Sequence, residues 1–193
     1  MRSIANAVLG EIDALRQGKP HLLAAIDGRS AAGKTTLAAL LQESCGCNVV
    51  HMDSFFLRPE QRTARRLSEP GGNVDRERFR EEVLGPLTGG QPFSYRPFDC
   101  KRQEFAPAVH VAPGPITVVE GAYSCHPQLF ESYDLTIFLS VGPDEQARRI
   151  AARNGQEGAT LFAERWIPME ERYFAACRTA ERCSLCFDTG DLL

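Results

Sequence analysis

Short apolar runs alternate along the chain with stretches whose apolar residues recur at helical spacing. The runs with the length of buried strands are His21–Asp27, Asn48–Met52, Ile116–Glu120, Leu135–Val141 and Ser184–Phe187. The stretches with helical periodicity are Ser3–Arg16, Lys34–Glu43, Arg76–Leu84, Pro143–Arg153 and Met169–Arg182. Strands that alternate with helices form parallel sheets covered on both faces. The pattern therefore predicts an α/β fold, a three-layer sandwich around a parallel, roughly five-stranded sheet.

One connection in this pattern is far longer than the rest. The second and third predicted strands are separated by residues 53–115, a stretch rich in Pro, Gly and Arg. Connections in α/β units usually have about 2–6 residues. The extra length indicates a binding function.

Composition and charge narrow the class of protein. The chain has 193 residues, of which 43% are hydrophobic and 24% charged, as expected for one globular domain. The net charge of -3 provides no overall positive field, so we predict no nucleic-acid and no membrane partner. Glu11 and Asp13 interrupt the first apolar stretch, unlike a secretory signal, and the seven cysteines are odd in number. We therefore predict a cytoplasmic protein.

A phosphate-binding motif follows the first predicted strand. Its residues are Gly28, Arg29, Ser30, Ala31, Ala32, Gly33, Lys34, Thr35 and Thr36. They fit G-x-x-x-x-G-K-[ST], in the strand-then-helix context that this motif requires. The backbone N–H groups of such a loop converge on phosphate oxygens, and the following helix adds its positive end. We predict that these residues bind ATP, with Lys34 on the β- and γ-phosphates and Thr35 on Mg²⁺.

Two acidic residues stand where predicted strands end. Asp53 follows the second strand, and Glu120 ends the third. In an open parallel sheet, ligands bind beyond the carboxyl ends of the strands, which is also the side of the phosphate-binding loop. Both residues are therefore candidates for catalysis or metal binding, with a solvated loop residue as the alternative.

The chain resembles the phosphoribulokinase and uridine kinase family of P-loop phosphotransferases. The motifs that carry the resemblance are Ile26–Thr36, His51–Phe56, Gly72–Asp75, Tyr95–Asp99, Val119–Gly121 and Arg148–Arg153. The resemblance implies that Asp53 takes the proton from the acceptor hydroxyl, that Asp75 binds the sugar hydroxyls, and that Glu120 lies on the magnesium side. A magnesium ligand acting through water stays open for Asp53, and a helix cap for Asp75.

The positions that recognise the nucleobase in nucleoside kinases hold different residues in this chain. The nucleoside-kinase pattern has a tyrosine before the Asp99 position and a histidine five residues after the tyrosine, where this chain has Phe98 and Gln103. By resemblance we assign acceptor binding to Asp75, Phe98, Asp99 and Gln103. The same connection carries the arginines 58, 62, 65, 66, 78 and 80. They indicate either a solvated charged face or an anionic acceptor.

A second arginine group indicates a lid. Arg148, Arg149 and Arg153 recur at helical spacing, so at most two can face the triphosphate. By resemblance we predict that Arg149 and Arg153 bind ATP phosphates from a lid at about residues 148–168, with a solvated face as the alternative. Trp166 is expected to anchor the end of the lid. His51, between apolar neighbours, is expected to be packed.

These features predict a single P-loop kinase domain over residues 1–193, with an acceptor-binding insertion at about 54–113. The predicted activity is ATP- and Mg²⁺-dependent transfer of the γ-phosphoryl group to an alcohol of a nucleoside-like or other sugar-containing small molecule. A phosphorylated sugar or vitamin precursor as acceptor stays open, as does a non-catalytic regulatory ATP-binding domain. The sequence also leaves open a homo-oligomer.

Overall fold

A five-stranded parallel sheet with strand order β2-β7-β1-β8-β9 forms the centre of the molecule. The computed structural model describes residues 1–190. The strands are β1 (Leu22–Gly28), β2 (Asn48–His51), β7 (Ile116–Glu120), β8 (Leu135–Ser140) and β9 (Leu185–Asp188). All neighbouring pairs in the sheet are parallel. The predicted sheet is confirmed.

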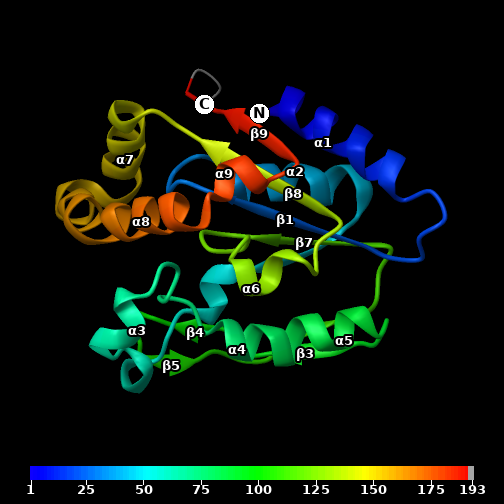
Figure 1. The fold of residues 1–193 in the computed structure, drawn as a ribbon, viewed down its shortest axis with the longest axis horizontal. Coiled ribbons are helices and arrows are strands. Elements are labelled where there is room, and N and C mark those ends of the chain that lie inside the picture. The colour runs from blue at the N-terminus through cyan, green and yellow to red at the C-terminus, as the bar shows by residue number, and fades with distance from the viewer. Residues whose placement is uncertain (191–193) are drawn as a thin grey trace.

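Side chains that alternate along the strands build one apolar core on each face of the sheet. Ala24 and Ile26 of β1 pack with α1 (Arg2–Leu15) and α2 (Lys34–Cys45), whereas Leu23 belongs to the opposite core. Figure 1 shows α1 and α2 on one side of the sheet and α4, α5 and α6 on the other. The period-two pattern of the strands thus gives the predicted three layers.

The second core combines short helices with aromatic side chains. Its helices include α4 (Arg76–Phe79), α5 (Gly85–Thr88) and α6 (Pro127–Phe130). A π-helical turn, Arg80–Leu84, joins α4 to α5, so the helix predicted to end at Leu84 continues to Thr88. Phe55 and Phe79 meet edge to face in this core, with ring centroids 5.0 Å apart.

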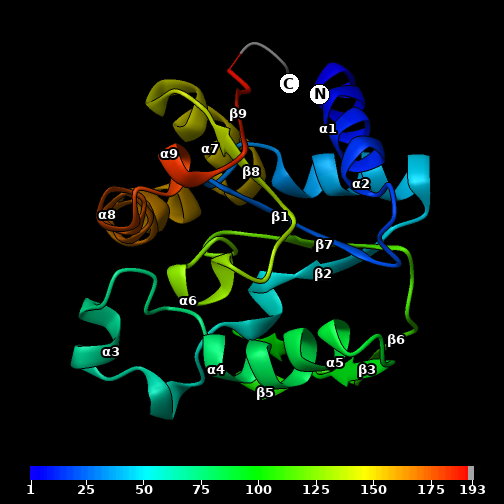
Figure 2. The same ribbon diagram turned by 45° about the vertical axis from the view of Figure 1, so that its right-hand side comes forward.

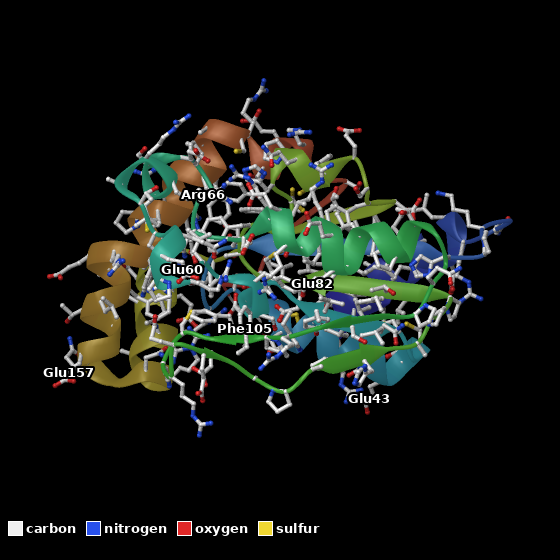
Figure 3. The ribbon with its side chains drawn as sticks, turned by 90° about the horizontal axis from the view of Figure 1, so that it is seen from below. Glu43, Glu60, Arg66, Glu82, Phe105 and Glu157 are labelled. Atoms are coloured by element: carbon white, nitrogen blue, oxygen red, sulfur yellow. The ribbon has the colours of Figure 1, made fainter. Side chains whose placement is uncertain are left out.

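Residues 54–113 lie along one side of the sheet (Figure 2). Beyond α4 and α5, this segment contains α3 (Ala64–Ser68) and two antiparallel strand pairs. The pairs are β3 (Phe93–Tyr95) with β6 (Val109–Val111), and β4 (Phe98–Asp99) with β5 (Glu104–Phe105). Glu60, Arg66 and Phe105 of this segment are labelled in Figure 3. Its role as an acceptor-binding insertion stays a prediction.

The C-terminal helices are interrupted twice. Helix α7 (Pro143–Leu161) is kinked at Gly155, and the π-helical turn Phe162–Trp166 leads into α8 (Ile167–Cys177). The prediction of one helix over Met169–Arg182 is wrong, because Arg178 adopts a left-handed conformation (φ 51°) before α9 (Thr179–Arg182) begins. Among residues 1–190, no helix combines the length and the apolar composition that a bilayer crossing requires.

The histidine at the start of α6 should make stability depend on pH. The ring of His126 is buried and stacks on Tyr173 at an interplanar angle of 5°, and its Nδ1 accepts from Gln128 N (3.2 Å). Burial and the nearby Arg76 guanidinium lower the pKa of His126 to about 4, from 6.5. Between these values the unfolded chain binds more protons, so acidification from pH 7 toward pH 4 should lower the free energy of unfolding by roughly 2 kcal/mol.

Urea denaturation at several pH values measures this effect. In a His126→Asn variant, the difference in unfolding free energy from the wild type should shrink as the pH falls from 7 to 4.5. The exposed His110 provides the control, since His110→Asn should keep the wild-type pH dependence. Parallel curves for the wild type and His126→Asn would contradict the prediction.

Candidate active site

A cavity of about 890 Å³ opens at the carboxyl ends of β1, β2 and β7. Its wall combines the phosphate-binding loop, the residues after β2 and β7, the 54–113 segment, and α7 with the start of α8. The charged residues that line it are Lys34, Asp53, Arg62, Lys101, Glu120, Arg148, Arg149, Arg153, Arg165 and Glu170. The structure therefore brings together residues that span positions 30 to 170 of the chain.

The phosphate-binding loop depends on glycine at two positions. Gly28 has φ 135°, and a Cβ placed on it would lie 2.0 Å from the carbonyl oxygen of Leu139, so no other residue fits there. Gly33 has φ 91°, at the start of α2. Lys34 Nζ donates to Gly28 O (2.8 Å) and to Arg29 O (2.9 Å). These bonds hold the ammonium group against the loop at the edge of the cavity.

The Thr35 hydroxyl and the Glu120 carboxylate lie side by side next to this loop. Thr35 Oγ1 lies 3.3 Å from both carboxylate oxygens of Glu120, which is buried at 5% exposure. Hydroxyl and carboxylate oxygens at a phosphate site are the ligands that Mg²⁺ takes from proteins. The donor set that the sequence predicted is thus consistent with a magnesium ion at Thr35 and Glu120.

His51 adjoins this carboxylate. Its Nδ1 lies 2.5 Å from Glu120 Oε1, and this hydrogen bond raises the pKa of His51 above its usual 6.5. The expectation of a packed histidine is wrong, because the side chain is exposed. The reason is its place on β2, an edge strand whose side chains are covered less completely than those of the central strands.

Asp53 is positioned by a 3₁₀ turn, Met52–Phe55, directly after β2. Its side chain is exposed to the cavity, and desolvation by the neighbouring protein groups raises its pKa above 3.8. The charge of Lys34 acts in the opposite direction, and that of Glu120 raises the pKa further. Gly121 (φ 139°) allows the backbone after β7 to lie close to Met52, since a Cβ on Gly121 would be 2.9 Å from Met52 Cβ.

Two carboxylates that the sequence analysis did not identify form hydrogen bonds that connect the phosphate-binding loop to α8. Asp27, fully buried in β1, accepts hydrogen bonds from Gly28 N (2.7 Å) and Tyr173 Oη (2.8 Å). It also accepts from the backbone after β7, at Tyr123 N (3.1 Å) and Cys125 N (2.8 Å). Burial raises the pKa of Asp27, and these hydrogen bonds oppose the rise. An acid inside an apolar strand was the only signal in the sequence.

Glu170 is the second of these carboxylates. It is buried and accepts from Ser30 N (3.0 Å) and Ser30 Oγ (2.5 Å). The next residue, Glu171, binds the Arg29 guanidinium through both oxygens (2.6 and 3.0 Å). Two residues assigned to phosphate binding, Arg29 and Ser30, thus also connect the loop to α8.

The predicted lid arginines differ in their contacts. Arg149 donates to Ala31 O (3.2 Å), Glu145 Oε1 (2.7 Å) and Thr189 O (2.6 Å), and thereby joins the loop to the end of β9. Arg153 lines the cavity, bonds to Asn154 Oδ1 (2.8 Å), and acts on Asp53 through its charge. Of the two, Arg153 is the better placed to contact a phosphate, because the Arg149 guanidinium is engaged within the protein.

None of the four predicted acceptor-binding residues lines the cavity. Phe98 is buried against Phe105, with centroids 5.6 Å apart, and Asp99 Oδ1 accepts from Lys101 N (2.8 Å) in a turn. Gln103 is exposed with φ 58°. Asp75 is 4% exposed, caps α4 at Arg78 N (3.1 Å), and accepts from Gln61 Nε2 (2.7 Å). Their assignment to the acceptor stays a prediction.

The capping contact of Asp75 is directly testable. Asp75→Ala should lower the free energy of unfolding by about 1–2 kcal/mol, because the Arg78 N–H loses its partner. Asp75→Ser keeps a capping oxygen and should recover most of this loss in urea denaturation. If the serine variant is as unstable as the alanine variant, the cap is not what Asp75 contributes. A serine variant that is stable but has a raised acceptor KM would support the sugar-binding role.

The order of the strands and the place of the phosphate-binding loop identify the fold. The five-stranded parallel sheet flanked by helices, with this loop after β1, is the α/β fold of solved P-loop kinase structures. No family model matches the chain.

Solved structures support this assignment of the fold. A structure from Bacillus stearothermophilus, described as a possible uridine kinase, matches with a TM-score of 0.67 at 18% identity, covering 94% of this chain and 100% of that one. YFH7 from Saccharomyces cerevisiae, described as a candidate P-loop-containing kinase with a circular permutation, matches with a TM-score of 0.66 at 11% identity, covering 97% and 98%. These likenesses establish the fold and leave the substrate open.

Proposed function

We propose that the protein is an ATP- and Mg²⁺-dependent kinase that phosphorylates an alcohol group of a sugar-containing small molecule. The observation that carries the proposal is the convergence of Lys34, Thr35, Glu120 and Asp53 on one cavity. Phosphoryl transfer needs positioning and charge neutralisation more than covalent chemistry from the protein. These four side chains are suited to both tasks.

The phosphate-binding loop would hold the donor. Its backbone N–H groups and the Lys34 ammonium bind the β- and γ-phosphates, while Thr35 and Glu120 hold Mg²⁺. The metal ion, when bound, neutralises charge on the same phosphates. Arg153, from the proposed lid at residues 148–168, adds positive charge and helps to exclude water.

Asp53 would act on the acceptor. Its carboxylate accepts a hydrogen bond from the acceptor hydroxyl and takes the proton as the hydroxyl oxygen bonds to the γ-phosphorus. The bond from that phosphorus to the β–γ bridging oxygen breaks, and ADP leaves. The pKa of Asp53 is raised toward the pH at which the enzyme would work, and a general base is most effective when its pKa lies near that pH.

The resemblance to uridine kinases and the description of the Bacillus stearothermophilus structure support a nucleoside-like acceptor. A regulatory ATP-binding domain is the competing function, and it would have no acceptor. A coupled ADP-release assay distinguishes them: nucleosides, vitamin precursors and sugar phosphates are offered with ATP and Mg²⁺. We expect acceptor-dependent ADP release that EDTA abolishes. Tight ATP binding without release for any acceptor would contradict the kinase proposal.

A further inference from the structure

Within the cavity wall formed by residues 54–113, two cations have no acidic partner among residues 1–190. We propose that the acceptor carries a phosphate group and that Arg62 and Lys101 bind it. This inference rests on the proposed kinase function and specifies the acceptor class. Both side chains line the cavity, and neither forms an ion pair with a carboxylate in residues 1–190.

The Arg62 guanidinium is half-buried and held in place from one side. Its Nε donates to Leu57 O (3.0 Å), and its Nη2 lies 3.8 Å from Cys100 Sγ. Nη1 makes no hydrogen bond within the described chain. An arginine fixed through Nε, with its terminal nitrogens at a cavity, has the geometry that binds phosphate or carboxylate oxygens in pairs.

Other arginines of the same segment are paired. Arg66 binds both oxygens of Glu77 (2.8 and 2.7 Å), and Arg78 lies 3.2 Å from Glu82. Arg66 and Glu82 are labelled in Figure 3. Arg76 likewise pairs with Glu69, and Arg58 with Glu60. Since these contacts account for four of the arginines as structural, Arg62 stands apart as the arginine of this segment that faces the cavity.

Two further residues of this wall favour a polar, charged ligand. The turn at Asp99, whose carboxylate accepts from Lys101 N (2.8 Å), fixes the backbone from which Lys101 reaches the cavity. Asn73 is 9% exposed and lines the cavity, and its side-chain amide makes no hydrogen bond within residues 1–190. The Asn73 amide is therefore free to bind a polar group of a ligand in the cavity.

The position of Arg62 assigns it to the acceptor side. Arg62 and Asp53 line the same cavity, and the Arg62 Nη2 lies 3.8 Å from Cys100 Sγ, on the wall formed by residues 54–113. The cations proposed for the ATP phosphates, Lys34 and Arg153, belong instead to the loop and to α7. If the acceptor were neutral, no negative charge would balance Arg62 and Lys101 when it is bound.

Binding and turnover with matched acceptor pairs test the inference. The pairs are D-ribose with D-ribose 5-phosphate and uridine with uridine 5′-monophosphate. Calorimetry is done with the donor site saturated by β,γ-methylene ATP and Mg²⁺, and ADP release is measured with ATP. We expect the phosphorylated member of at least one pair to bind about 10-fold or more tightly. Arg62→Gln should remove most of this preference, since hydrogen bonds to charged groups are stronger than those between neutral groups.

Arg65→Gln is the matched control, because Arg65 is exposed on α3 and does not line the cavity. It should leave both acceptor binding and the KM for ATP unchanged, and Arg62→Gln should also leave the KM for ATP unchanged. Equal binding within both pairs, or an Arg62→Gln effect confined to ATP, would overturn the inference. If Arg62-dependent phosphate binding occurs without ADP release, the kinase proposal fails while the anionic site stands.

Discussion

Replacing Lys34 by alanine is expected to lower kcat by about 100- to 1,000-fold, because removing one charge clamp on a transition state costs roughly 2.7–4 kcal/mol. Lys34 Nζ already lies at the phosphate-binding loop, 2.8 Å from Gly28 O, so its charge is in place before the reaction. The measurement is single-turnover ADP formation at saturating ATP, with the acceptor that the release assay identifies.

Loss of folding must be separated from loss of charge in this variant. Lys19→Ala is the control, since Lys19 pairs with Asp134 and does not line the cavity. Thermal unfolding should show Lys34→Ala to be folded, and Lys19→Ala should keep wild-type turnover. Turnover of Lys34→Ala within a few-fold of the wild type would refute the P-loop kinase function.

Replacing Asp53 by asparagine is the second large expected effect. The amide retains the size of the carboxylate but accepts no proton at neutral pH, so kcat should fall by roughly 100-fold or more. The KM for ATP should stay near the wild-type value. In the wild type, turnover should also decline on acidification at a pH above the ordinary pKa of an aspartate, because desolvation by the neighbouring protein groups raises the pKa of Asp53.

Asp13→Asn, on the exposed face of α1, controls for the change of charge and should leave kinetics unaltered. Two results would reassign Asp53. A collapse of ATP and Mg²⁺ affinity would make it part of the metal site, the alternative that the sequence left open. Unchanged kcat with unchanged affinity would remove it from the reaction altogether.

Local pattern was enough for most of the fold. The strand and helix around Gly28–Lys34 follow from an apolar run, a glycine-rich loop and a helical period, all within neighbouring residues. The same holds for β7 and its terminal Glu120. The break at Arg178 was not predictable in this way, because a left-handed arginine carries no clear local signal.

Contacts between distant segments decided the details of the site. Asp27 and Tyr173, which share a hydrogen bond of 2.8 Å, are 146 positions apart, and Glu170 meets Ser30 across 140 positions. The arginine pattern of α7 likewise could not separate Arg149, whose guanidinium donates to Thr189 and Ala31, from Arg153, whose side chain bonds to the adjacent Asn154. Helical spacing specifies a face, while the neighbours of that face come from packing.

By itself, the sequence determined the α/β class, the order of the main elements and the candidate phosphate and magnesium residues, because these depend on periodicity and on a contiguous motif. Only the tertiary structure decided which charges are free to meet a ligand. Arg62 and Arg66 are both arginines of one polar segment, yet Glu77 neutralises Arg66 while Arg62 faces the cavity without a carboxylate partner in residues 1–190. That difference arises from side-chain pairing in three dimensions, which no spacing along the chain specifies.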